Sequence, residues 1–151
     1  MDELEIKVKL QISKPVSEVK DAIIRADKMA NYFIAEGARN MEEGKNIQWT
    51  FPEFPEMIID VKILKIDSDQ VIFEWEGSKN KQLEVRIDLE ERPGNSTLIT
   101  VSEGKMKYDP EGIVWLKRNT EGWSNFLACM KAYLEFGINL RKGGFEFMKA
   151  S

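Results

Sequence analysis

The stretch TEGWSNFLACMKAYLEFG, Thr120 to Gly137, constrains the fold most, because it combines helical spacing with a wide apolar face. At roughly 100° per residue, its apolar side chains fill about half of the helical wheel. A helix that only covers a core needs an apolar stripe somewhat over ~100° wide. Two interpretations follow: the helix is sunk deep in an ordinary core, or part of its apolar face lines a cavity. The side chains concerned are Trp123, Phe126, Leu127, Cys129, Met130, Tyr133, Leu134 and Phe136.

Length and charge limit the class of protein. A chain of 151 residues with 42% hydrophobic content predicts a single domain with its own core, residues 1–151. The net charge is −4, from 22 Lys and Arg against 26 Asp and Glu, and no basic block is present. This distribution argues against a nucleic-acid partner. No apolar run reaches the ~18 residues that a membrane span needs. The N-terminus MDELEIKVK is charged where a signal peptide is apolar, so we expect a cytoplasmic protein.

The residue types available restrict the chemistry. The chain contains no histidine and a single cysteine, Cys129. Ser-His and Cys-His nucleophile arrangements are therefore excluded, as are zinc sites of the His or Cys type. Cys129 lies in the apolar face and is interpreted as a small buried hydrophobe. A carboxylate that enters a cavity could act as a base, and Glu36 and Glu103 are the candidates. We predict no catalytic residue, no metal site and no cofactor, with enzymatic activity as the less favoured alternative.

Hydrophobic periodicity predicts one strand, two short helices, five strands and a long helix, in that order. LEIKVKLQI alternates strictly between apolar and polar residues, which is typical of a half-buried strand. Ser13 and Pro15 mark the start of a helix, and Asp27 is a candidate cap for a second short one. After Asp109-Pro110 helical spacing returns, and it ends at Arg141 to Gly144. The five strands between are NIQWTF, MIIDVKILKI, QVIFEWE, QLEVRIDLE and STLITVSE.

Short connections between these strands favour an antiparallel meander, in which one face of the sheet is buried. The helix with the widest apolar face is the element that can cover that face. We therefore predict an α+β fold with the long C-terminal helix packed on an antiparallel sheet. The side chains expected beneath the helix are Trp49, Phe51, Phe73, Trp75, Leu83, Val85, Ile87 and Leu89.

The segment FPEFPE, residues 51–56, carries more apolar surface than a loop requires. Its two Phe-Pro steps restrict the backbone to extended conformations. The segment either closes on its own hairpin or exposes Phe54 as an anchor at a ligand mouth or for a protein partner. Trp115 presents the same choice, and we expect it to be buried under the start of the long helix.

Several features taken together resemble the START-like superfamily. A proline opens the first helix in SKPVSEVKDAI, Tyr32-Phe33 form an aromatic pair, and a tryptophan closes VIFEW. A threonine follows the first residue of STLITVSEG, and Gly122-Trp123 lead into KAYLE. The likeness spans almost the whole chain and is greatest to the C-terminal domain of activators of the ninety-kilodalton heat-shock-protein ATPase. The chain departs from many relatives in carrying Tyr32-Phe33 where they have tryptophan.

This resemblance implies a helix-grip fold, in which a curved antiparallel sheet of about six strands wraps around the C-terminal helix. Two short helices follow the first strand, and an apolar cavity often lies between the helix and the sheet. Part of the helix face, including Met130, would then face that cavity. The residues expected to bind a ligand are Tyr32, Phe33, Trp49, Phe51, Phe73, Trp75, Phe126, Met130 and Tyr133.

Three functions stay open. The first is non-catalytic binding of a small hydrophobic or amphipathic molecule such as a lipid, suggested by the aromatic content and the missing catalytic set. The second is a co-chaperone-like module in the stress response, with a chaperone or other protein as partner, suggested by the closest branch. The third is a cavity enzyme of the polyketide-cyclase type. We expect a monomer or a weak homodimer.

Overall fold

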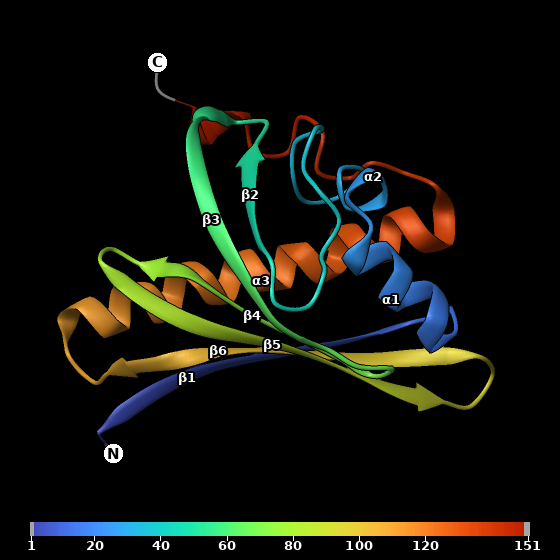
Figure 1. Cartoon of the computed structure of the whole chain (residues 1–151), viewed down its shortest axis with the longest axis horizontal. Helices are drawn as coiled ribbons and strands as arrows, with labels where there is room; N and C mark the ends of the chain where they lie inside the picture. The colour runs from blue at the N-terminus through green and yellow to red at the C-terminus, as the bar shows by residue number, and fades with distance from the viewer. Residues whose placement is uncertain (1, 150–151) are drawn as a thin grey trace.

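A computed structural model describes residues 2–149 and contains one antiparallel sheet around one long helix (Figure 1). The six strands are paired in the order β1-β6-β5-β4-β3-β2, so every connection except that between β1 and β2 is a hairpin. In chain order the elements are β1 (Glu3–Ile12), α1 (Val16–Ile24), α2 (Ala26–Met29), β2 (Asn46–Phe51), β3 (Phe54–Ile66), β4 (Gln70–Ser78), β5 (Lys81–Arg92), β6 (Ser96–Lys107), α3 (Pro110–Phe136) and the 3₁₀ helix η1 (Glu146–Met148). The predicted helix-grip fold is confirmed.

Alternation along the strands decides which face of the sheet meets α3. On β5, Leu83, Val85 and Ile87 are buried, whereas Glu84 and Arg86 between them face outward. Successive side chains of a strand point to opposite faces, so one face becomes continuously apolar. The sheet curves around α3, which lies against this inner face along much of its length (Figure 1).

Helix α3 begins and ends at clear local signals. The Asp109 side chain accepts a hydrogen bond from the Gly112 backbone N–H at 2.8 Å, and Pro110 occupies the first turn. The helix stops at Phe136 because Gly137 adopts a left-handed conformation with φ of 66°. The predicted end at Arg141 to Gly144 is therefore too late. Trp115 is fully buried, as expected, and it is itself a residue of α3, near the start of that helix.

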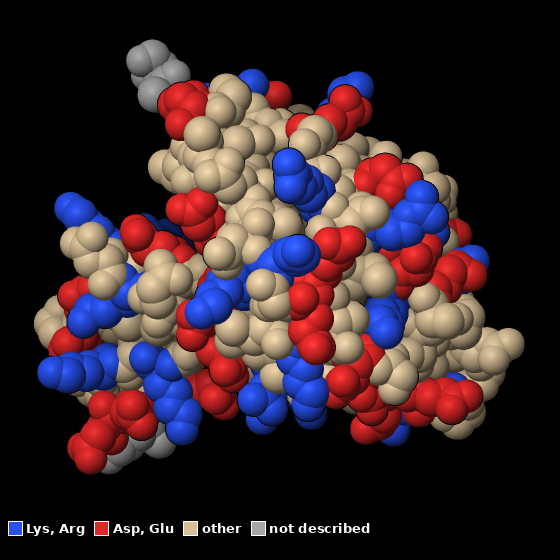
Figure 2. Space-filling model, viewed as in Figure 1, with Lys and Arg blue, Asp and Glu red and all other residues tan. Residues whose placement is uncertain are grey.

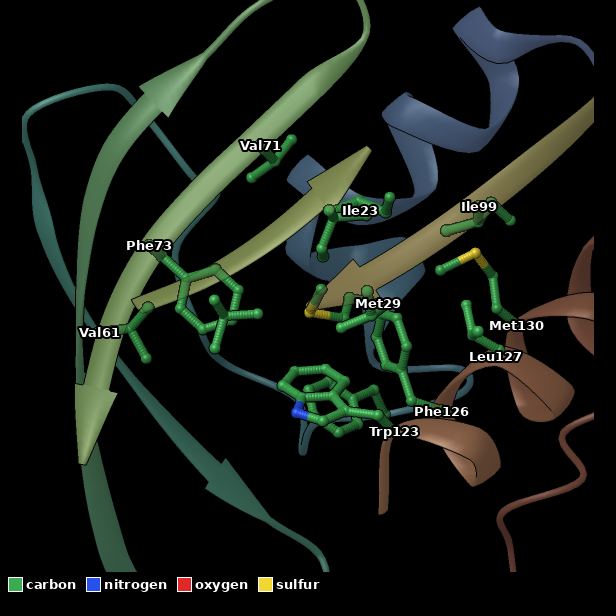
Figure 3. Close-up of a cluster of buried hydrophobic side chains, with 14 of the residues drawn as sticks. Ile23, Met29, Val61, Val71, Phe73, Ile99, Trp123, Phe126, Leu127 and Met130 are labelled. Carbon is green, nitrogen blue, oxygen red and sulfur yellow. The ribbon is translucent and has the colours of Figure 1, made fainter. Parts of the chain in front are cut away.

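Helices α1 and α2 cover the open end of the sheet and complete the core (Figure 1). The Tyr32 hydroxyl donates a hydrogen bond to the Ala22 carbonyl at 2.9 Å, which fixes the turn after α2 against α1. Figure 3 shows Phe126, Leu127 and Met130 projecting from α3 toward the strands. The buried side chains labelled in that view also include Ile23, Met29, Val61, Val71, Phe73, Ile99 and Trp123.

FPEFPE closes on its own hairpin, which is one of the two predicted alternatives, because Phe51 pairs directly with Phe54. Two local predictions differ from the structure. Strand β3 starts at Phe54, earlier than the predicted start at Met57. Asp27 does not cap α2: the N-cap residue is Arg25, and Asp27 forms an ion pair with it from the first turn. Within residues 2–149, no helix combines the length and the apolar composition that crossing a membrane would take.

Candidate ligand-binding site

An aromatic pocket of about 260 Å³ opens between the tip of the β2–β3 hairpin, the end of β4, the middle of α3 and the segment after α3. In the space-filling view the outline is indented between the β2–β3 tip and the β4–β5 end of the sheet (Figure 2). Charges of both signs are mixed over this face of the molecule. The pocket wall consists of Phe33, Phe51, Phe54, Ile59, Trp75, Glu76, Gly77, Asn119, Gly122, Trp123, Asn125, Arg141, Phe145 and Met148.

The inner wall of the aromatic pocket is a set of interlocked rings. Phe33 meets Phe51 and Phe126 nearly edge to face, with ring centroids 5.2 and 4.7 Å apart. Trp75 and Trp123 lie 5.4 Å apart in a tilted arrangement. Such pairs contribute about 0.5–1.5 kcal/mol each beyond the area that they bury. The wall is therefore rigid, and it presents ring faces and edges to any molecule that enters.

Behind this wall lies a buried carboxylate, Glu103, which is 1% exposed. Trp75 Nε1 donates a hydrogen bond to Glu103 Oε2 at 2.7 Å. Trp123 Nε1 and Asn119 Nδ2 both donate to Glu103 Oε1, each at 3.0 Å. All three partners are hydrogen-bond donors at the atoms used, so these hydrogen bonds favour the ionised acceptor form of the carboxyl. The Glu103 carboxyl is thus held by neutral N–H groups of residues that also belong to the pocket wall.

The electrostatic balance at Glu103 has two opposing parts. Burial raises the pKa of the Glu103 carboxyl above its ordinary value, and the hydrogen bonds from Trp75, Asn119 and Trp123 offset part of this rise. The Trp115 indole N–H also lowers this pKa, but its nitrogen lies outside hydrogen-bonding geometry and has no partner within residues 2–149. Four N–H groups therefore surround one carboxylate.

Gly77 on β4 makes room for this carboxylate. A Cβ atom at position 77 would lie 2.2 Å from Glu103 Oε2, well inside contact distance. The Gly77 carbonyl in turn accepts a hydrogen bond from Asn119 Nδ2 at 2.9 Å. The absence of a side chain at Gly77 is therefore required for β4, β6 and α3 to meet around Glu103.

The segment after α3 closes one side of the aromatic pocket through Arg141. Its Nη2 atom lies 2.6 Å from Glu53 Oε1 at the tip of the β2–β3 hairpin, and the two side chains are 16% and 8% exposed. The Arg141 guanidinium carbon also lies 5.4 Å from the Phe51 ring centroid and 4.7 Å from that of Phe145. Cation–π contacts of this kind add about 0.5–2 kcal/mol. Arg141 thus attaches residues 137–149 to the rest of the pocket.

Replacing Arg141 with alanine should detach this segment locally. Glu53 would lose its cation and Phe145 its guanidinium contact, while α3 and the sheet keep theirs. We expect the global free energy of unfolding to change by less than about 1 kcal/mol and exchange of backbone amides in residues 137–149 to accelerate. The affinity for a naphthalene-type probe should fall about 3- to 10-fold. Hydrogen exchange and calorimetry measure these effects. Lys142→Ala, at an exposed neighbouring position, is the control, and equal effects of the two variants would contradict the role of Arg141.

The structure separates the nine predicted ligand-binding residues into two groups. Phe33, Phe51 and Trp75 lie on the wall of the aromatic pocket. The other six lie outside it: Trp49, Phe73, Phe126, Met130 and Tyr32 are buried in the core, and Tyr133 is half-buried and stacks on Tyr32. Their role in binding stays a prediction. Sequence reasoning did not propose Asn119, Arg141 or Phe145 as site residues, although one of its alternatives for Phe54 was an anchor at a ligand mouth.

A substitution of Met130 tests whether the core around this residue is densely packed. It is 0% exposed and lies beside Leu127 and Ile99 (Figure 3). Met130→Trp should therefore overpack the core and lower the free energy of unfolding by about 1–3 kcal/mol, as measured in urea. Met130→Leu, which changes volume little, is the control. An unchanged stability for Met130→Trp would instead show that an unfilled cavity adjoins the helix at this position.

A curved antiparallel sheet that grips a long C-terminal helix, with a pocket beside that helix, defines the START-like class of proteins. Within this class the chain belongs to the family of Activator of Hsp90 ATPase homolog 1-like proteins, whose family model matches residues 13–135. None of the curated proteins matches the chain in sequence.

Solved structures share the fold. Protein SSP2350 from Staphylococcus saprophyticus is 24% identical, with a TM-score of 0.78 over 91% of this chain and 96% of that one. DynU16, from the dynemicin biosynthetic locus, is 20% identical, with a TM-score of 0.76 over 89% of this chain and 48% of that one. The Aha1 dimer from Colwellia psychrerythraea is 17% identical, with a TM-score of 0.73 over 89% of this chain and 98% of that one. At these identities the likeness supports the fold alone.

Proposed function

We propose that this protein binds a small hydrophobic or amphipathic molecule in the aromatic pocket without transforming it. The observation that carries the proposal is the pocket itself: about 260 Å³, with aromatic rings as the largest group on its wall and a few polar groups at Glu76, Asn119, Asn125 and Arg141. Small-molecule sites have this composition, because apolar walls supply affinity and a few polar atoms fix orientation.

The position of Glu103 supports binding rather than catalysis. A general base must reach the proton that it removes, directly or through one water. Both Glu103 oxygens are instead occupied by N–H donors of the wall, and Trp75, Trp123 and Asn119 stand between the carboxylate and the pocket. Glu36, the other candidate base, is exposed and does not line this pocket. These arrangements give the two carboxylates no direct access to a bound ligand.

A protein-interaction function is the second candidate, and one observation favours it. Four large apolar side chains at and beyond the end of α3 are mostly exposed: Phe136, Ile138, Leu140 and Phe147. Exposed apolar groups that lie close in sequence are typical of contact surfaces. Membership of a family named after a chaperone activator supports a chaperone as the partner of such a surface.

Two measurements test the proposed function. Calorimetric titration of the purified protein with naphthalene should show saturable binding at one site per chain. Native mass spectrometry of protein purified from its own host should show a retained small molecule. A co-purified chaperone, with neither a retained molecule nor naphthalene binding, would contradict the proposal and favour the second candidate.

A further inference from the structure

Both amide hydrogens of Asn119 are committed to the protein. Asn119 Nδ2 donates to the Gly77 carbonyl at 2.9 Å and to Glu103 Oε1 at 3.0 Å. An asparagine amide has two N–H donors and one carbonyl acceptor. The donor side of Asn119 therefore faces β4 and β6 and is saturated there.

The reverse orientation of this amide is strongly disfavoured. A rotation by 180° would bring Asn119 Oδ1 against the Gly77 carbonyl oxygen and the Glu103 carboxylate, so that three acceptors would meet without a donor. Two hydrogen bonds would be lost, one of them to a charged group. Glu103 is itself held by Trp75 and Trp123, whose indoles only donate. The hydrogen-bond partners therefore distinguish the nitrogen of the Asn119 amide from its oxygen, which the shape of the side chain alone does not.

Within residues 2–149, the hydrogen bonds of the Asn119 side chain leave its carbonyl oxygen without a partner. It accepts no hydrogen bond in the part of the chain that the structure describes, and it is not among the buried polar atoms without a partner. Asn119 belongs to the pocket wall, between Trp123 and Gly77. The Arg141 guanidinium, also on this wall, is already paired with Glu53. A molecule that enters thus meets aromatic rings and, beside the Glu76 carboxylate and the Asn125 amide, the carbonyl oxygen of Asn119.

We propose that Asn119 Oδ1 is a fixed hydrogen-bond acceptor that selects aromatic ligands carrying a hydroxyl or N–H donor. Glu103 is the positioning residue, because the hydrogen bond that its Oε1 atom accepts keeps the amide from turning. This inference rests on the proposed function and adds a chemical class to it: a phenol-like molecule with an aromatic body and one donor. A freely turning amide would serve donor and acceptor ligands equally, whereas a fixed one discriminates between them.

Three probes separate these cases in the unmodified protein. Naphthalene measures binding to the aromatic pocket without any hydrogen bond. Its derivative 2-naphthol adds a hydrogen-bond donor, whereas 2-methoxynaphthalene keeps the oxygen but offers only an acceptor. We expect 2-naphthol to bind about 3- to 10-fold more tightly than 2-methoxynaphthalene, as one net hydrogen bond predicts. Calorimetry at fixed pH and salt measures the ratio of the two dissociation constants.

Two leucine variants locate the acceptor. In Asn119→Leu the ratio should fall to about 1, because the acceptor is gone while the aromatic wall remains. In Asn125→Leu, which removes the other amide on the wall, the ratio should persist even where both affinities change. Circular dichroism and urea unfolding establish that each variant is folded. Should Asn119→Leu not fold, the three probes on the unmodified protein still decide whether the pocket holds a fixed acceptor, and Asn125→Leu decides whether Asn125 is that acceptor.

Each outcome has one meaning. If none of the three probes binds the unmodified protein, the proposed function fails and this inference fails with it. If naphthalene binds but 2-naphthol and 2-methoxynaphthalene bind equally, the proposed function stands and the fixed acceptor is rejected. If the preference survives in Asn119→Leu or disappears in Asn125→Leu, the acceptor lies elsewhere on the wall and the assignment to Asn119 is overturned.

Discussion

Glu103→Leu should lower the free energy of unfolding by about 3 kcal/mol or more, since it leaves three buried N–H groups without an acceptor at about 1–3 kcal/mol each. Leucine is somewhat larger than glutamate, so the loss does not come from an empty space. Replacing a buried charge by an apolar group can be neutral when its partners change with it. In Glu103→Leu the three donors are unchanged, and they meet a leucine side chain that cannot accept a hydrogen bond. These donors are the indoles of Trp75 and Trp123 and the Asn119 amide.

Urea unfolding of matched variants isolates this effect. Glu84→Leu makes the same change on the outer face of β5, where the Glu84 side chain is 45% exposed, and should alter stability by no more than about 0.5 kcal/mol. Glu103→Gln retains a carbonyl acceptor and should fall between the two. A loss below about 1 kcal/mol for Glu103→Leu would mean that its donors find other partners, and that the network does not hold the wall in place.

Most of the fold could be predicted from the sequence because it depends on local periodicity. The predicted strand NIQWTF matches β2 exactly, and QLEVRIDLE lies within β5. The end of α3 was placed too late, because Arg141 and Lys142 provide cations at a plausible stop while Gly137 acts several residues earlier through its left-handed conformation. A glycine's φ angle is not visible in a sequence, so the choice between two stop signals required the structure.

The candidate site was less predictable, because its polar contacts join residues far apart in the chain. Asn119 is 16 residues from Glu103 and 42 from Gly77, and Arg141 is 88 from Glu53. Periodicity placed Glu103 in a strand but could not distinguish a buried carboxylate from a solvated one. One available signal was its phase: Glu103 follows Ile99 and Val101 at steps of two residues, which points its side chain to the same apolar face. A charged residue in that phase is rarely buried without dedicated partners.

Phe126 and Met130 show why an apolar helix face does not by itself locate a cavity. Both were expected to face a ligand, and both are at most 1% exposed and packed within the core. The wide apolar face of α3 is used twice: one part packs on the sheet, and Trp123 together with Gly122 reaches the pocket wall. Periodicity measures how much of a helix is apolar, whereas neighbouring elements decide which part is covered.

Gly122→Trp should block the aromatic pocket without destabilising the protein. Gly122 lies on the pocket wall, and a Cβ atom there would meet no other atom within 4 Å. The side chain of a helical residue covers the turn before its own Cα, which here carries Asn119 on the same wall. The indole would therefore occupy space that a ligand needs. Because glycine is unfavourable inside a helix, stability should stay unchanged or rise by up to about 0.5 kcal/mol.

Calorimetric titration with naphthalene should show at least a 10-fold loss of affinity for Gly122→Trp, equivalent to about 1.4 kcal/mol. Ser124→Trp adds the same ring to an exposed position of α3 outside the pocket wall and should bind naphthalene like the unmodified protein. Met130→Trp makes a useful comparison. The same ring should lower the free energy of unfolding when it is placed in the core, and the affinity for naphthalene when it is placed in the pocket. Undiminished naphthalene binding by a folded Gly122→Trp would place the ligand elsewhere and reject the aromatic pocket as the site.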